Sequence, residues 1–152
     1  MSGRVEALWI KRAHRGVMDP AEAVTLVAEK GIDTDANFGR SKRQVTLIEK
    51  EVFDRIMKEL TDVEPYMRRA NVMVSGVRLE DTRDHLITLG DVRIRLYGET
   101  RPCERMDAQV EGLTSALDAN WAGGAYGVVL DDGEISVGDP VTIAATEAQE
   151  AV

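Results

Sequence analysis

The feature that most constrains the fold is a strict alternation of apolar with polar or aromatic side chains over residues 91–98. The alternation runs through Val92-Arg-Ile-Arg-Leu-Tyr97. Successive side chains of a β-strand point to opposite faces, so this period predicts a strand with one side in the core and the other exposed. The strand leads through Gly98 into the loop that carries the single cysteine of the chain.

Other short segments have the same character, and Gly-rich turns separate the later ones. We expect strands over residues 5–10, 43–48, 68–77, 126–130, 134–137 and 141–144. Helices are expected over residues 20–30, 49–60 and, as a short element, within 106–121. Strands and helices do not alternate regularly, so a doubly wound sheet is disfavoured. The pattern predicts a mostly β (α+β) fold, a closed barrel with peripheral helices, built as one domain over residues 1–145 with a mobile tail at 146–152.

Charge is distributed unevenly along the chain. The net charge is −8, which argues against general binding of nucleic acid. All 19 Lys and Arg lie at or before Arg105, whereas residues 106–152 carry nine acids and no base. The anion-attracting part is therefore expected in the first two thirds of the chain. No segment has the length of a membrane span or the pattern of a signal peptide, so we expect a cytoplasmic protein without a membrane partner.

Cys103 is the best candidate for chemistry. A lone cysteine forms no internal disulfide and no multi-cysteine metal site, which leaves nucleophilic, sulfur-carrying or single-ligand roles. Arg101 and Arg105 flank it and favour the thiolate, while Glu104 acts in the opposite direction. The alternative is an inert buried cysteine.

Six sequence blocks together resemble one protein family. They are Arg43-Gln-Val-Thr-Leu-Ile, Arg69-Ala-Asn-Val, Leu89-Gly-Asp-Val-Arg-Ile, Arg101-Pro-Cys-Glu-Arg-Met, Gly123-Gly-Ala-Tyr-Gly-Val-Val-Leu and Gly133-Glu-Ile-Ser-Val-Gly-Asp-Pro-Val. In this order they resemble the MOSC domain, named for the C-terminal domain of molybdenum cofactor sulfurase, as a small stand-alone bacterial-type member. The resemblance implies a barrel of the pyruvate-kinase type, and Cys103 matches the cysteine of its Pro-Cys block.

The resemblance implies two roles for that cysteine. In one, Cys103 accepts sulfur as a persulfide from a cysteine desulfurase and passes it to a metal-sulfur acceptor, with Arg101 or Arg105 stabilising the anionic sulfur. Pyridoxal phosphate would then belong to the desulfurase and not to this chain. In the other, the Cys103 thiolate ligates the molybdenum of a bound molybdenum cofactor. The chain would accordingly be a sulfur transferase or a component of a molybdenum-dependent oxidoreductase.

Cationic and polar residues of the matching blocks are candidates for holding the cofactor. The candidate contacts are Arg43, Arg69, Asn71 and Thr100, and the cations available for a pterin phosphate are Arg40, Lys42, Arg43, Arg68 and Arg69. Asn71 is alternatively a turn residue that satisfies backbone groups.

The chain departs from the family pattern in three places. The stretch 31–38 has no histidine, Trp121-Ala-Gly-Gly replaces an Arg-Gly-Gly block, and the N-terminal barrel of larger relatives has no counterpart. A non-catalytic β-barrel module that holds an anionic ligand or a partner protein on its basic face is therefore the alternative function.

Overall fold

The computed structural model describes residues 3–13, 18–59, 70–99 and 124–144. Within these ranges the chain is mostly strand, with one helix. The elements are β1 (Gly3–Lys11), β2 (Met18–Ala21), β3 (Ala23–Val27), β4 (Gly31–Ile32), β5 (Val45–Glu49), α1 (Lys50–Glu59), β6 (Val72–Ser75), β7 (Leu86–Leu89), β8 (Val92–Glu99), β9 (Ala125–Val129), β10 (Gly133–Ser136) and β11 (Pro140–Ala144).

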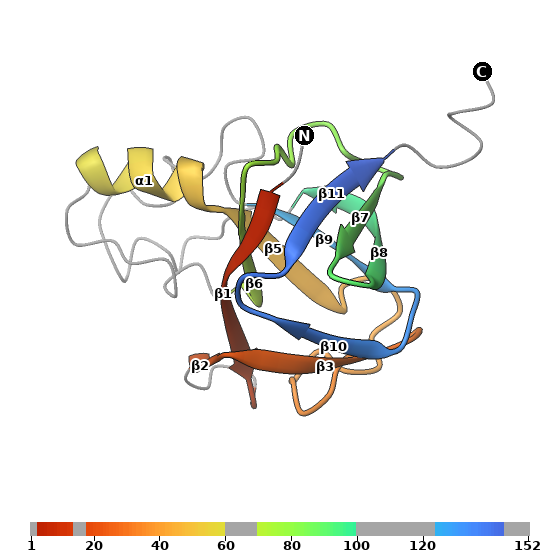
Figure 1. Ribbon diagram of the computed structural model, residues 1–152. Coiled ribbons are helices and arrows are strands. Elements are labelled where there is room, and N and C mark those ends of the chain that lie inside the picture. The colour runs from red at the N-terminus through yellow and green to blue at the C-terminus, as the bar shows by residue number, and fades with distance from the viewer. Residues whose placement is uncertain (1–2, 14–17, 60–69, 100–123, 145–152) are drawn as a thin grey trace, which may run out of the picture.

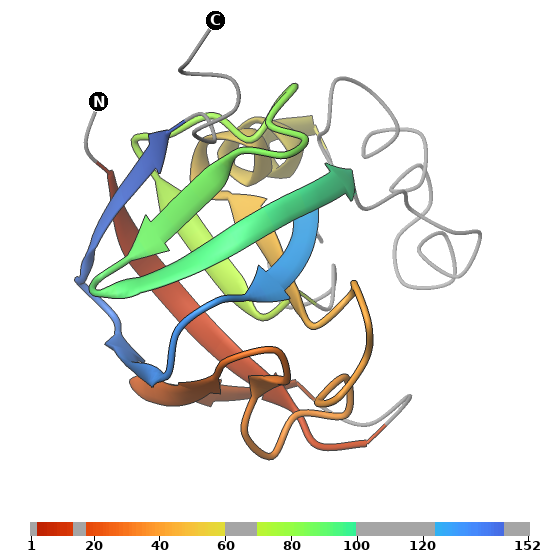
Figure 2. The same ribbon diagram turned by 90° about the vertical axis from the view of Figure 1, so that its right-hand side faces the viewer.

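Seven strands close into a barrel in the order β11-β7-β8-β9-β5-β6-β1, and pairing between β1 and β11 completes the ring (Figure 2). β5 and β6 run parallel, and the remaining neighbours in the ring are antiparallel. A parallel pair needs a crossover connection, and α1 lies in the connection between β5 and β6. The predicted class, a mostly β fold with a closed barrel, is confirmed.

A second, three-stranded sheet in the order β10-β3-β4 lies at the end of the barrel opposite α1 (Figure 1). The long strand β1 links the two parts. Its first residues, Gly3 and Arg4, pair with β11, whereas Leu8 to Lys11 pair with β2. The chain continues from β2 almost directly into β3, so the small sheet extends from the barrel wall.

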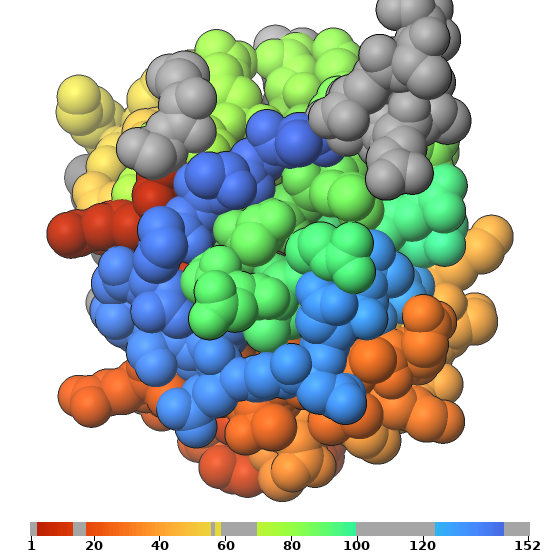
Figure 3. Space-filling model, turned by 45° about the vertical axis from the view of Figure 1, so that its right-hand side comes forward, coloured from red at the N-terminus to blue at the C-terminus, as the bar shows by residue number. Residues whose placement is uncertain are grey.

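The barrel interior is the main hydrophobic core. β8 shows how the sequence period produces it: Val92, Ile94 and Leu96 are buried in the interior, whereas Arg93 and Arg95 are exposed. This confirms the predicted alternation. On the outer surface, β11 and β7 lie side by side, as their antiparallel pairing requires (Figure 3).

A second apolar cluster joins α1 to the outside of the barrel. Phe53 of α1 is fully buried and packs in one cluster with Trp9, Ile48 and Met73 of the barrel wall. Because α1 follows β5 without a break, its apolar face lies directly over the strand that it leaves. The helix predicted over 49–60 is therefore confirmed, within one residue at each end.

The helix predicted over residues 20–30 is wrong, because β2 and β3 occupy this stretch. Pro20, the first residue of the predicted helix, lies in β2 at the edge of the barrel wall, where it pairs with Trp9. Val24 and Leu26 alternate with exposed neighbours in β3, and Glu29 takes a positive φ of 65° at the turn that follows. Pairing of β3 with β10, more than 100 residues away, outweighs the local helical pattern.

The helix predicted within 106–121 and the tail at 146–152 lie outside the described residues. No helix in the described part of the chain combines the length and the apolar character needed to cross a bilayer.

Candidate functional site

Three cations lie close together on the loop between β4 and β5, and the buried side chain of Gln44 holds this loop on the barrel. Gln44 Nε2 donates to the carbonyl oxygens of Glu29 (2.9 Å) and Arg40 (2.7 Å). Its Oε1 accepts from the Val129 amide of β9 at 3.1 Å. Asn37 Nδ2 donates to the Arg43 carbonyl oxygen at 3.1 Å. The backbone of the loop is thus fixed while its cationic side chains stay exposed.

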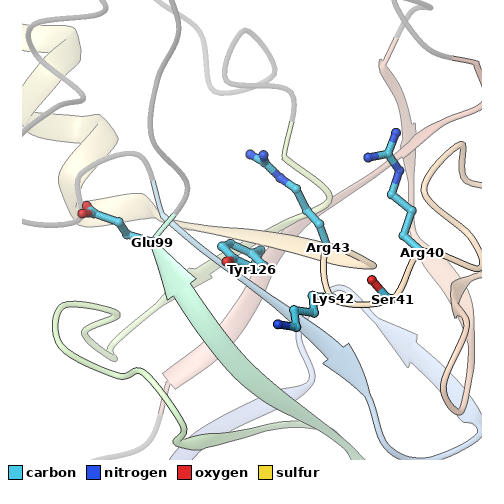
Figure 4. Close-up of a pocket in the computed structure, with 6 residues that line it drawn as sticks. All are labelled: Arg40, Ser41, Lys42, Arg43, Glu99 and Tyr126. Carbon is cyan, nitrogen blue, oxygen red and sulfur yellow. The ribbon is translucent and has the colours of Figure 1, made fainter.

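The loop forms one wall of a cavity of about 430 Å³ (Figure 4). β8 and β9 supply the other residues. Among the described residues, the lining includes Arg40, Ser41, Lys42, Arg43, Glu99 and Tyr126. Glu99 lies on the far side of the cavity from Arg40, so the cations gather at one end and the carboxylate lies at the other (Figure 4).

Aromatic rings lie beneath these cations. The guanidinium carbon of Arg43 is 5.7 Å from the centre of the Tyr126 ring. Lys42 Nζ lies 5.9 Å from the centre of the Tyr97 ring, and the Arg95 guanidinium carbon lies 5.5 Å from the same point. Such contacts contribute about 0.5–1 kcal/mol at exposed sites. They restrain cations that are otherwise exposed, which reduces the entropy lost when an anion binds.

Gly98 shapes the strand end next to the cavity. The register between β8 and β9 shifts between Leu96 and Gly98, and such a bulge changes the direction of the residues beyond it. A Cβ atom at Gly98 would lie 3.3 Å from the Tyr126 hydroxyl oxygen, closer than side chains normally approach. Glycine at this position therefore leaves room for Tyr126 in the cavity wall, while the bulge sets where Glu99 points.

The lining favours an organic anion over a metal ion. Arginine and lysine bind phosphate or carboxylate oxygens through charge-assisted hydrogen bonds, and the hydroxyl groups of Ser41 and Tyr126 add donors. Within the described ranges, no group of three or more His, Cys, Asp and Glu residues is arranged to hold a metal ion. The chemistry available here is recognition of an anionic group of cofactor or substrate size.

The structure describes four of the predicted candidates. Arg43 lines the cavity, as do Arg40 and Lys42 from the predicted phosphate-binding set. Asn71 is 2% exposed and lies in an internal network. The remaining candidates lie outside the described residues: Thr100, Arg101, Cys103, Arg105, Arg68 and Arg69.

The side chain of Asn71 forms hydrogen bonds with β5 and β1 of the barrel wall and with the loop between β4 and β5. Its Oδ1 accepts from the backbone amide (3.1 Å) and the hydroxyl (3.2 Å) of Thr46. Its Nδ2 donates to the Trp9 carbonyl oxygen (3.3 Å) and to Asp35 Oδ1 (2.9 Å). The buried Asp35 carboxylate also accepts from the amides of Lys11 (2.8 Å) and Asn37 (2.9 Å). In this arrangement Asn71 connects three segments of the fold.

Sequence reasoning did not identify Tyr126, Glu99, Ser41 or Gln44 as parts of the site. A signal existed for Tyr126, since it lies within the block that begins at Gly123. Gln44 carried a weaker signal, because it directly follows the loop segment that contains Arg40, Lys42 and Arg43. Glu99 and Ser41 carried none, because only strand pairing and the path of the loop bring them to the cavity.

Comparison with known proteins adds a family match and several structural likenesses. Residues 33–142 match the family described as the MOSC domain. No curated protein matches the chain by sequence. The solved structure of the YUAD protein from Bacillus subtilis is similar, with a TM-score of 0.83 at 20% identity over 97% of this chain and 98% of that one.

Two structures of YiiM are also similar. That of the Geobacillus stearothermophilus protein has a TM-score of 0.72 at 15% identity, covering 93% of this chain and 75% of that one. That of the Escherichia coli protein has a TM-score of 0.69 at 14% identity, covering 94% of this chain and 70% of that one. At these identities the likenesses show the fold.

Proposed function

Because this chain belongs to the MOSC domain family, we propose that it acts in molybdenum cofactor chemistry. In this proposal the basic cavity holds an anionic ligand of molybdenum-cofactor type. Cys103 supplies the thiolate that carries sulfur or ligates molybdenum. The observation that carries the proposal is the cavity at the end of β8, which brings Arg40, Lys42 and Arg43 next to the strand that leads to Cys103.

Chain connectivity supports this combination. Glu99 lines the cavity and is the last residue of β8, and Cys103 follows four residues later. Four residues span at most about 14 Å of extended chain, so the thiol is tethered within a ligand's length of the cavity. A cysteine on such a tether can meet a ligand whose anionic end is bound by the loop between β4 and β5.

The cavity residues suit a phosphate-bearing pterin ligand. Its volume of about 430 Å³ falls within the roughly 300–1,000 Å³ typical of small-molecule sites. Arg40 and Arg43 would hold the phosphate at the end away from Glu99, since the carboxylate repels a second anion. The bound cofactor would supply a metal centre that a soft thiolate can ligate.

As a sulfur carrier, the chain would use ordinary thiol exchange. The Cys103 thiolate attacks the outer sulfur of the persulfide on a cysteine desulfurase, the sulfur–sulfur bond of the donor breaks, and the donor cysteine leaves as a thiolate. Cys103 then carries the persulfide. Arg101 or Arg105 would stabilise its negative charge, and attack by the acceptor on the outer sulfur returns Cys103 to the thiolate.

The test is to incubate the protein with a cysteine desulfurase and cysteine, and then to measure its intact mass. We expect a gain of one sulfur atom in the wild type and none in Cys103→Ser. Arg43→Gln is the matched control, because it changes the cavity and keeps the thiol. A wild type that gains no sulfur, or a Cys103→Ser variant that does, would rule out the carrier role.

Molybdenum analysis tests ligation separately. Protein expressed with ample molybdate should contain molybdenum in proportion to protein, and Cys103→Ser should lose it. Arg43→Gln should lower the content if the loop holds the cofactor phosphate. Equal molybdenum in the wild type and in Cys103→Ser would exclude ligation by Cys103.

The alternative is a non-catalytic module that binds an anion. The described lining residues favour it, because the loop, β8 and β9 supply three cations and two hydroxyl groups that suit an anion whether or not a thiol takes part. Here pyrophosphate, used as the probe, should bind the wild type and Cys103→Ser equally and Arg43→Gln more weakly. Absence of sulfur and molybdenum in the tests above, together with this result, would favour the module.

A further inference from the structure

A second cavity, of about 500 Å³, lies where α1 packs beside the end of β6. It is separate from the basic cavity. Arg43 of the basic cavity precedes β5, whereas Glu49 of the second cavity is the last residue of that strand, so the two cavities lie at opposite ends of β5. Figure 1 shows the course of β5 into α1.

The carboxyl group of Glu49 is the feature of this cavity that requires explanation. Glu49 is only 6% exposed and lines the cavity. In the part of the chain that the structure describes, no side chain forms a hydrogen bond or an ion pair with it. Burial raises its pKa and the nearby charge of Glu51 adds to that shift, while the hydrogen bond from the Leu79 amide and the charges of Arg78 and Arg55 only partly oppose it. A buried carboxylate without a charged partner is costly, and a ligand that brings a positive charge would remove this cost.

The walls beside Glu49 are apolar. Val52 of α1 and Val77, which follows β6, line the cavity, and each is 6% exposed. Their side chains suit a short aliphatic group. Among the described residues, no group of three or more His, Cys, Asp and Glu side chains is arranged here to hold a metal ion, and one oxygen of the neighbouring Glu51 accepts from the Gly76 amide at 2.7 Å.

The rim of the cavity carries cations, whereas its interior carries the carboxyl group of Glu49. Asp54 is paired with Lys50 at 2.8 Å, and Arg78 is paired with Glu80 at 3.0 Å. Arg55 and Lys58 also line the cavity, are exposed, and form no ion pair with any residue of the described ranges. They lie three positions apart on α1 and therefore on neighbouring parts of one helix face. The cavity thus has an acid within, apolar walls, and cations at its mouth beside the exposed carboxylate of Glu51.

We propose that this cavity binds a small zwitterion of amino-acid type. Its ammonium group pairs with Glu49, its aliphatic part lies against Val52 and Val77, and its carboxylate faces Arg55 and Lys58. A simple alkylammonium ion would satisfy only the inner end of this arrangement, and a fatty acid only the outer end.

Three probes of equal chain length test the proposal: 5-aminopentanoate, pentylammonium and pentanoate. Binding is followed through the methyl resonances of Val52 and Val77 and by calorimetry at pH 7. We expect 5-aminopentanoate to bind most tightly. Glu49→Gln should weaken its binding at least tenfold, and Arg55→Gln should weaken 5-aminopentanoate while leaving pentylammonium unchanged. Glu134→Gln, which removes an exposed carboxylate of β10, is the matched control and should bind like the wild type.

Other outcomes would overturn the proposal. These are no methyl shift with 5-aminopentanoate at millimolar concentration, unchanged binding in a folded Glu49→Gln variant, or binding of pentylammonium as tight as that of the zwitterion. Thermal unfolding of each variant shows that the fold is retained. None of these readouts depends on Cys103 or on the basic cavity, so the proposed function can fail while this inference holds, or the reverse.

Discussion

The buried contact between Asn71 and Asp35 offers a sharp test of how this barrel is held together. The amide Nδ2 lies 2.9 Å from Asp35 Oδ1 and donates to it. Asn71→Asp keeps the shape of the side chain and the oxygen that accepts from Thr46. It replaces the Nδ2 donor by a carboxylate oxygen. Two carboxylates then face each other in a site where Asn71 is 2% exposed and Asp35 5% exposed.

The cost can be worked out from this geometry. Two unit charges about 4 Å apart repel by about 4 kcal/mol at an effective dielectric constant of about 20. Protonating the introduced carboxyl avoids the repulsion and restores a donor. An aspartic acid has an unperturbed pKa near 3.9 and each pKa unit is worth about 1.4 kcal/mol, so protonation costs about 4 kcal/mol at pH 7 and about 1.5 kcal/mol at pH 5.

The sign of the pH dependence follows from linkage. The introduced carboxyl has a raised pKa in the folded state, so stability is retained below its unfolded pKa and is lost as the pH rises toward the folded pKa. We therefore expect Asn71→Asp to lower the free energy of unfolding by about 4 kcal/mol at pH 7 and by about 1.5 kcal/mol at pH 5. Urea denaturation followed by circular dichroism at both pH values measures this difference.

A double exchange provides the control. Asp35→Asn combined with Asn71→Asp restores one amide and one carboxylate, so the difference between the two pH values should largely vanish. A loss below about 1 kcal/mol for Asn71→Asp at pH 7, close to the uncertainty of the measurement, would refute the reasoning. An equal loss at both pH values would refute it as well.

Two further predictions concern the backbone and the surface. Gly124 and Gly138 both have a φ of +95°, but a Cβ at Gly124 would collide with the Leu47 carbonyl whereas the space at Gly138 is open. Gly138→Ala should cost about 1–2 kcal/mol and Gly124→Ala clearly more, measured as unfolding free energies; equal costs would contradict the steric argument. Arg93 lowers the pKa of Asp131 through a hydrogen bond at an exposed site. Arg93→Gln should therefore lower stability by less than about 1 kcal/mol above pH 4.5, and the difference should shrink as acid protonates Asp131; a constant difference down to pH 2 would contradict this.

The fold could be predicted where the spacing of apolar residues fitted only one kind of secondary structure and the tertiary structure kept that element. The alternation over 91–98 identified the inner and outer faces of β8, and the apolar stripe over 49–60 identified α1. β7 went unrecognised because it is a four-residue strand without a long alternating pattern. Residues 20–30 were misread because their apolar residues fit a helical stripe and a strand alternation equally well, and only pairing with β10 distinguishes the two.

Of the residues in the candidate site, only the cations could be predicted from the sequence. Arg40, Lys42 and Arg43 lie within four consecutive residues, so their clustering is visible without a structure. The position of Asn71 in a matching block made it a candidate contact, and the alternative was a turn residue that satisfies backbone groups. Its burial against Asp35 depends on contacts with residues 25 to 62 positions away, and no local pattern reports such contacts.

The sequence by itself determined the β-rich class, the family, the single thiol at Cys103 and the concentration of positive charge before it. These properties depend on residue type, on the spacing of apolar residues and on the order of short blocks along the chain, and all three can be read from the sequence without a structure. Only the tertiary structure decided that Arg43 faces Tyr126 and that Glu99 closes the same cavity. The physical reason is that β5, β8 and β9 come together through hydrogen bonds between segments distant in sequence, and closure of the barrel fixes their register.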